Sequence, residues 1–113
     1  MKTSDRIRLQ HMLDAAREAV LFSSNRSRSD LDDDRMPVHS FIRPIEIIGE
    51  AAGKVSIECR SEFPQIAWRE IINMRNRLIH GYDDINLNIV WKTVIVYLPS
   101  LIGELEKILS SSL

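Results

Sequence analysis

The sequence lacks most of the residues from which disulfide frameworks, zinc sites and membrane spans are built. Cys59 is its one cysteine, so no intramolecular disulfide can form, and no spacing of cysteine and histidine resembles a zinc site. No apolar run approaches the roughly 18 residues that a membrane-spanning helix needs, and the N-terminus lacks the apolar core of a signal peptide. We therefore expect a soluble cytoplasmic protein with no membrane association and no metal or other cofactor.

Net charge is nearly absent as well. The 15 Lys and Arg residues balance 16 Asp and Glu residues, which gives a formal charge of −1. Bulk charge therefore neither indicates nor excludes a polyanionic partner, and any nucleic-acid contact must come from a local patch. At 113 residues the chain is long enough for one modest domain and too short for two separate cores. We predict a single domain over residues 1–113.

What the sequence does contain is helical periodicity. Apolar residues recur at intervals of three and four, the pattern of helices that bury one face. This pattern predicts an all-α fold, an antiparallel bundle of four to five helices, with helices at about 4–23, 37–61, 66–80 and 87–109.

Several residues set the expected boundaries of the first two helices. Ser4 or Asp5 is the expected N-cap of the first helix, and residues 24–34 read as a polar connection. Pro44 interrupts the second helical pattern, so the regular helix either begins near Phe41 or kinks at the proline. Gly49, on the apolar side of this helix, offers a small surface where another helix can approach closely.

The fourth helix has the cleanest apolar stripe in the sequence. The stripe includes Val94, Tyr97 and Leu98, so Tyr97 is expected in the core. Pro99 falls on the polar side, where a kink would be tolerable.

Arg75 lies in the middle of the apolar stripe of the third helix. A cation in this position is costly unless it meets a carboxylate or a ligand anion, because desolvating an ion costs several kcal/mol. In a structural interpretation, Arg75 pairs with Glu46 or Glu50 of the second helix. In a functional interpretation, its guanidinium holds a phosphate in bidentate fashion.

His80 and Tyr82 follow at the end of the same helix, before and after Gly81. His80 is about 140° around an ideal helix from Arg75, so the two converge only if the helix unwinds or a second subunit contributes. His80 is either a cap for the helix C-terminus or a proton carrier. Tyr82 either packs at the helix end or exposes its hydroxyl to a modifying enzyme.

An imidazole and a guanidinium together can cleave RNA without metal. The base removes the proton of a ribose 2′-hydroxyl, and the arginine stabilises the charge that develops on the phosphorus centre. His11 and His39 are weaker candidates for this chemistry, because each is expected on an exposed or partly packed helix face.

The segment Arg75-Asn-Arg-Leu-Ile-His80-Gly-Tyr82 matches the R-x4-H-x-Y pattern of the HepT-like proteins, a branch of the HEPN superfamily of helical ribonucleases. The segments Ile47-Ile-Gly-Glu-Ala-Ala52, Trp68-Arg-Glu-Ile71 and Ile89-Val-Trp91 also resemble those of the family. The resemblance extends from about Asp5 to Leu105. Pro44 departs from the family pattern expected in the second helix.

This resemblance implies a specific function. HepT-like proteins are toxins of type VII-like toxin–antitoxin pairs that cleave RNA as homodimers, with their motifs facing a shared cleft. Their usual antitoxin is an MntA-type nucleotidyltransferase, which transfers AMP from ATP to the motif tyrosine. By motif position, Arg75 and His80 would be catalytic, Asn76 would support them, and Tyr82 would be the AMP acceptor.

Two other functions fit the same sequence. The first is a catalytically silent helical module that binds a nucleotidyltransferase. The second is a structural bundle with no nucleic-acid role. Cleavage of RNA that depends on His80 would distinguish the ribonuclease from both.

Overall fold

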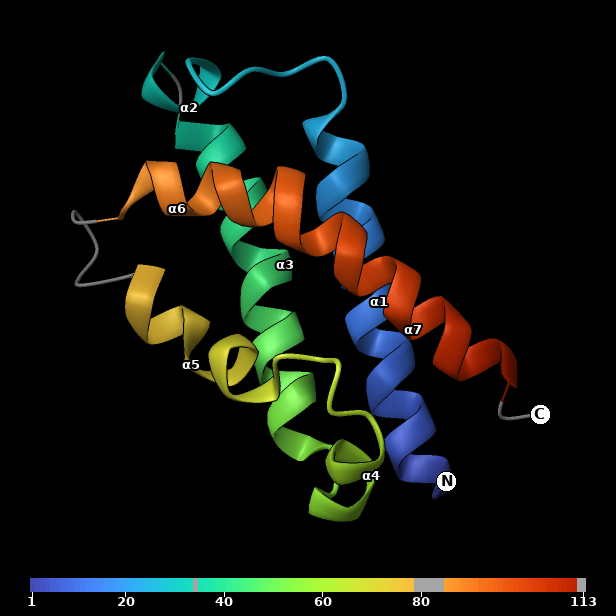
Figure 1. Ribbon diagram of the computed structural model, residues 1–113. Helices are drawn as coiled ribbons and strands as arrows, with labels where there is room; N and C mark the ends of the chain where they lie inside the picture. Colours follow the sequence, from blue (N-terminus) through green and yellow to red (C-terminus); the bar gives the residue numbers. More distant parts are fainter. Residues whose placement is uncertain (34, 79–84, 112–113) are drawn as a thin grey trace.

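The computed structural model contains helices and connecting segments, with no strand in the part of the chain that it describes (Figure 1). It describes the backbone of residues 1–33, 35–78 and 85–111, and their side chains except those of residues 35–37 and 75–78. In chain order the elements are α1 (Thr3–Ser23), α2 (Asp30–Asp33), α3 (Arg35–Lys54), α4 (Ile57–Glu62), α5 (Trp68–Leu78), α6 (Leu87–Lys92), the π-helical turn η1 (Thr93–Tyr97) and α7 (Leu98–Ser111).

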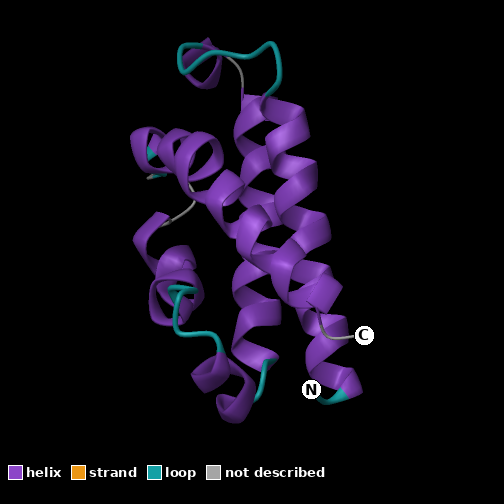
Figure 2. Cartoon of the chain, turned by 45° about the vertical axis from the view of Figure 1, so that its right-hand side comes forward, coloured by secondary structure: helices purple, strands orange, loops and turns teal. Residues whose placement is uncertain are grey.

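The core is centred on α1. α1 lies against both α3 and α7, and α5 packs mainly on α3. The start of α1 and the end of α7 lie at the same end of the bundle in both views (Figures 1 and 2). Among the fully buried side chains are those of Leu9, Phe41, Val94 and Leu105. The predicted all-α fold is confirmed. No helix formed by the described residues is long and apolar enough to cross a membrane.

The predicted second helix, 37–61, is wrong in its extent. α3 begins at Arg35, continues through Pro44 and ends at Lys54, and a separate helix, α4, follows. The helix is interrupted here because Ser56 is the N-cap of α4. The Ser56 hydroxyl accepts a hydrogen bond from the Cys59 N–H at 3.1 Å. An N-cap residue has extended backbone, so it cannot lie inside a continuous helix.

Neither Ser4 nor Asp5 is the N-cap of α1, contrary to prediction, because Lys2 holds that position. α1 begins at Thr3, and the Asp5 side chain is only 3 % exposed. Its carboxylate accepts hydrogen bonds from the Ser56 N–H at 2.8 Å and the Ser56 hydroxyl at 2.7 Å. Asp5 therefore fastens the first turn of α1 to the turn between α3 and α4.

The ionisation of Asp5 follows from these contacts. Burial disfavours the charged carboxylate, but the two hydrogen bonds from Ser56 and the nearby positive charge of Lys2 outweigh it and hold the pKa of Asp5 below its ordinary value. Because the folded-state pKa is the lower one, ionised Asp5 stabilises the fold above the unfolded-state pKa. This contribution is lost as the pH falls through the folded-state pKa.

Replacing Asp5 with alanine should lower the free energy of unfolding by about 1–3 kcal/mol at neutral pH, because two donors of Ser56 lose their buried acceptor. The deficit should shrink in acid, where native Asp5 is itself protonated. Urea unfolding followed by circular dichroism at neutral and acidic pH measures both effects. Glu18→Ala, at an exposed position of the same helix, is the control. An equal loss of stability in the two variants would contradict the role given to Asp5.

The 24–34 connection is more ordered than predicted, because it contains the short helix α2. Two hydrogen bonds build the turn before it: the Ser27 N–H donates to the Asp30 carboxylate at 2.7 Å, and Arg28 reaches Asp32 at 3.1 Å. Leu31 is 3 % exposed and gives this segment an apolar anchor in the core. The polar composition of residues 24–34 therefore gave no indication that Leu31 is buried.

Tyr97 is 52 % exposed, so its predicted place in the core is wrong. The reason is η1, in which the Leu98 N–H bonds to the Thr93 carbonyl five residues back. In this wider turn, residue i+4 rather than residue i+3 lies on the same helix face as residue i. Leu98 is therefore buried together with Val94, and Tyr97 points to the surface. Pro99, exposed as predicted, lacks an N–H and crowds the preceding turn, which accounts for the wider turn there.

Candidate functional site

α5 carries the first half of the sequence motif, and packing fixes where α5 lies. Trp68 and Ile71 are buried, and the indole N–H of Trp68 donates to the Phe63 carbonyl at 3.0 Å. Arg75 and Asn76 belong by backbone to the last turn of α5, which ends at Leu78. Their side chains lie outside the described residues.

α3 supports α5 through a close backbone approach at Gly49, as predicted. A Cβ atom added at Gly49 would lie 3.3 Å from the Ile71 carbonyl oxygen, tighter than ordinary van der Waals contact. On the same helix, Glu46 is half-buried and Glu50 is exposed. Their pairing with Arg75 stays a prediction, because the Arg75 side chain is not among those described.

His80 and Tyr82 lie outside the described residues, so the distance between them and Arg75 stays a prediction. The helix that follows them is well fixed. Asn86 is the N-cap of α6, and its side-chain oxygen accepts the Ile89 N–H at 3.1 Å. The Phe41 ring of α3 then meets Trp91 of α6 edge to face, with ring centroids 6.2 Å apart.

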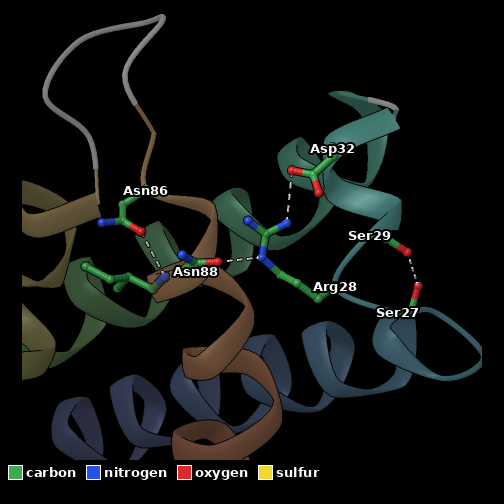
Figure 3. Close-up of polar contacts among 7 residues, drawn as sticks. Ser27, Arg28, Ser29, Asp32, Asn86 and Asn88 are labelled. Carbon is green, nitrogen blue, oxygen red and sulfur yellow. Dashed lines mark hydrogen bonds and ion pairs between the residues drawn. The ribbon is translucent and has the colours of Figure 1, made fainter.

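Arg28 makes a second connection to α6 that sequence reasoning missed. Its Nε donates to the Asn88 side-chain oxygen at 2.8 Å, while its Nη1 reaches Asp32 at 3.1 Å (Figure 3). The two side chains come from segments 60 residues apart. The Arg28–Asp32 spacing of four is a usual helical ion-pair spacing, but no local pattern indicates the contact with Asn88.

The two weaker histidine candidates are both exposed, His11 on α1 and His39 on α3. Among the described residues, no three His, Cys, Asp or Glu side chains cluster in a way that could hold a metal ion. Burial raises the pKa of the Cys59 thiol, and the carboxylates of Asp5 and Glu62 raise it further, so this buried cysteine is a thiol rather than a nucleophilic thiolate.

An apolar groove of about 330 Å³ adjoins the motif helix, and the sequence did not predict it. It is lined by residues of α3, of α5 and the segment directly before it, and of the helix formed by residues 87–111. Met74, directly before Arg75, is one lining residue, and Tyr97 is another. The remaining lining residues are Ile45, Ile48, Gln65, Ile66, Ala67, Glu70, Ile71, Ile89, Thr93, Leu98, Ser100, Leu101 and Glu104.

Comparison with known proteins supplies the family. The family model described as Ribonuclease HepT-like matches residues 12–108. A relative from Thermococcus cleftensis named "Probable ribonuclease HepT" is 34 % identical over 108 residues, covering 96 % of this chain and 98 % of the relative.

Two further relatives carry provisional names as RNases. One, from Caldanaerobacter subterraneus subsp. tengcongensis, is 34 % identical over 101 residues, 89 % of this chain and 90 % of the relative. The other, from Methanocaldococcus jannaschii, is 32 % identical over 98 residues, 87 % of this chain and 90 % of the relative. No solved structure is significantly similar to the chain. The match along nearly the whole chain and the all-helical fold agree, and the protein is a member of the HepT-like ribonuclease family within the HEPN superfamily.

Proposed function

We propose that this protein is a metal-independent endoribonuclease and the toxin of a type VII-like toxin–antitoxin pair. The observation that carries the proposal is the R-x4-H-x-Y motif of residues 75–82, which begins in the last turn of a helix fixed against α3, inside the region that the family model matches. The RNase names of the relatives support the same activity.

His80 is the general base of the proposed reaction. It takes the proton of a ribose 2′-hydroxyl, and the 2′-oxygen then attacks the adjacent phosphorus. The bond to the 5′-oxygen breaks, that oxygen takes up a proton, and a cyclic phosphate remains on the other fragment. Arg75 stabilises the negative charge on the phosphate oxygens as the bonds exchange, and Asn76 supports it as a neighbouring polar group.

The reaction requires Arg75 and His80 to act on one phosphate, although they are about 140° apart on an ideal helix. A homodimer meets this requirement, because a two-fold axis can bring the motif of one copy next to that of the other. Two motif helices facing one cleft would then give an RNA strand contacts from both copies.

Tyr82 is the proposed switch of the toxin. An MntA-type nucleotidyltransferase would transfer AMP from ATP to the Tyr82 hydroxyl, releasing pyrophosphate. The added phosphate carries negative charge close to Arg75, the group that should receive the substrate phosphate. The modified tyrosine would therefore compete with RNA for Arg75.

The activity is tested with purified protein and RNA in EDTA, after mass spectrometry has confirmed that Tyr82 is unmodified. We expect cleavage that leaves cyclic phosphate ends and does not depend on added metal. An unmodified protein that binds the nucleotidyltransferase but leaves RNA intact would overturn the activity and favour the catalytically silent module.

A further inference from the structure

A cleft between α1 and α3 has no part in the reaction described above. Its volume is about 800 Å³, within the range of clefts that hold a small organic ligand. α1 contributes Glu18 and Phe22, α3 contributes Ser40 and Arg43, and Arg26 comes from the connection that follows α1. This connection passes over the end of the bundle to α2 (Figures 1 and 2). The cleft therefore brings together two arginines from separate segments of the chain.

The two arginines give the cleft an excess of positive charge. Arg26 and Arg43 are both exposed, and no carboxylate of the described residues lies within ion-pair distance of either. Arg17, on α1, differs from them because its Nη2 lies 2.8 Å from the Glu106 carboxylate. Glu18 is the one acidic residue among those that line the cleft in the described part of the chain. The whole chain has a formal charge of −1, so the positive charge of the cleft is a local feature.

Arg26 is held in a fixed orientation on an aromatic ring. Its guanidinium carbon lies 4.0 Å from the centroid of the Phe22 ring, and its Nε donates to the Phe22 carbonyl at 2.9 Å. The Phe22 ring meets the buried Phe41 ring edge to face, with centroids 5.3 Å apart. The ring quadrupole attracts the cation, so the guanidinium plane is fixed before any ligand binds. Arg26 is exposed, and the face of the plane opposite Phe22 is the one that meets solvent.

The backbone before Arg26 is fixed as well. Asn25 has a φ of 66°, in the left-handed region that asparagine adopts more readily than most residues. Next to it, the Ser24 N–H donates to the Leu21 carbonyl and the Arg26 N–H donates to the Ser23 carbonyl, each at 3.1 Å. This tight reversal turns the chain back over the last turn of α1, where the Arg26 side chain meets Phe22.

An exposed guanidinium plane next to a second cation suits one nucleotide of single-stranded RNA. Proteins bind unpaired bases by stacking them on arginine planes or aromatic rings, and they hold the phosphates with basic side chains. Arg26 offers the plane, and Arg43 offers a fork of N–H donors for a phosphate. An inorganic anion or an acidic protein segment would use the two charges and leave the plane without a base.

We propose that this cleft binds a nucleotide of the RNA substrate outside the cleavage site, with the base stacked on Arg26 and the phosphate held by Arg43. This inference rests on RNA as the substrate in the proposed function. The motif helix lies elsewhere on α3, where Gly49 approaches it. The described chain measures 44 × 28 × 19 Å, and about eight stacked nucleotides, at about 3.4 Å each, cross its 28 Å width. One strand can therefore reach both places.

Binding of an uncleavable RNA tests the cleft. The probe is a labelled 2′-O-methyl oligonucleotide of about 16 nucleotides, which spans the bundle and lacks the attacking 2′-hydroxyl. Arg26→Ala and Arg43→Ala should each raise its dissociation constant about tenfold, as measured by fluorescence anisotropy. Arg17→Ala is the matched control, because it removes the same charge from α1 outside the cleft and should leave the dissociation constant unchanged. Circular dichroism checks that each variant is folded.

Further substitutions separate stacking from charge. Arg26→Lys keeps the charge but loses the plane, so it should bind the oligonucleotide nearly as weakly as Arg26→Ala. Arg43→Lys keeps a charge for the phosphate and should bind nearly as tightly as native protein. Arg43→Ala should also reduce the slope of log affinity against log salt concentration by about 0.7, the value for one lost phosphate contact with a single strand. Glu18→Gln removes the carboxylate of the cleft and should tighten binding.

Three outcomes would overturn the nucleotide site. The first is native affinity for the oligonucleotide in folded Arg26→Ala and Arg43→Ala proteins. The second is an equal loss of affinity in Arg17→Ala, because overall charge would then explain the binding. The third is a loss in Arg43→Ala alone, since the cleft would then hold a phosphate without a stacked base. In each case, RNA cleavage by the native protein leaves the proposed function in place.

The remaining outcomes concern another occupant and the activity. If Arg26→Ala and Arg43→Ala lose their complex with a nucleotidyltransferase but keep native affinity for the oligonucleotide, the occupant is that protein and the inference fails. Native protein that binds the oligonucleotide through both arginines but cleaves no RNA upholds the nucleotide site and overturns the activity.

Discussion

Replacing His80 with alanine is expected to lower the rate of RNA cleavage by about 10²–10⁴-fold, the usual contribution of a general base. The loss should appear at saturating RNA, because the imidazole acts on the 2′-hydroxyl proton and not on substrate binding. Single-turnover cleavage of a labelled oligonucleotide measures the rate.

The chain offers matched controls for this variant. His39 and His11 are exposed on other helices, so His39→Ala and His11→Ala should cleave at the native rate. A His80→Ala protein that has lost its helical circular-dichroism signal would support the alternative in which His80 only caps the end of the motif helix. Cleavage at the native rate by folded His80→Ala protein would contradict the proposed role of the base.

Replacing Tyr82 with phenylalanine should leave RNA cleavage intact and abolish its control by the nucleotidyltransferase. Phenylalanine keeps the ring but lacks the hydroxyl oxygen that accepts the AMP group. Intact mass after incubation with the enzyme and ATP should rise by AMP for native protein and stay constant for the variant. Cleavage assays on the same samples should show loss of activity in the native protein alone.

The second tyrosine of the chain provides the control. Tyr97, the last residue of η1, is half-exposed, so its hydroxyl is accessible to an enzyme. Tyr97 lies outside the motif. Tyr97→Phe should still gain AMP and lose cleavage activity. AMP transfer that persists in Tyr82→Phe and disappears in Tyr97→Phe would contradict the proposal, because the acceptor would then be Tyr97.

Sequence periodicity predicted the fold class and the helix on which Arg75 and Asn76 lie, because both depend on local patterns. The stripe through Trp68 and Ile71 identified the buried face of α5, and Gly49 correctly indicated where another helix, which the structure shows to be α5, approaches α3. Both predictions need only helical geometry and side-chain size.

The features that were missed depend on residues far apart in the chain. Asp5 and Ser56 are 51 residues apart, and no local pattern distinguishes an N-cap of α1 from a buried acceptor for another helix. The contact between Arg28 and Asn88 spans a similar gap. The groove depends on how α5 and the 87–111 helix lie on α3, and that arrangement cannot be obtained from any single stripe.

The π turn in η1 adds one residue to the helix formed by residues 87–111. Val94 and Leu98 are both buried with three residues between them. Deleting one of those three would leave Val94 and Leu98 three positions apart, a spacing that an ordinary α-helix also keeps on one face. A chain one residue shorter would therefore still bury both Val94 and Leu98. The additional residue lies on the exposed surface of the helix.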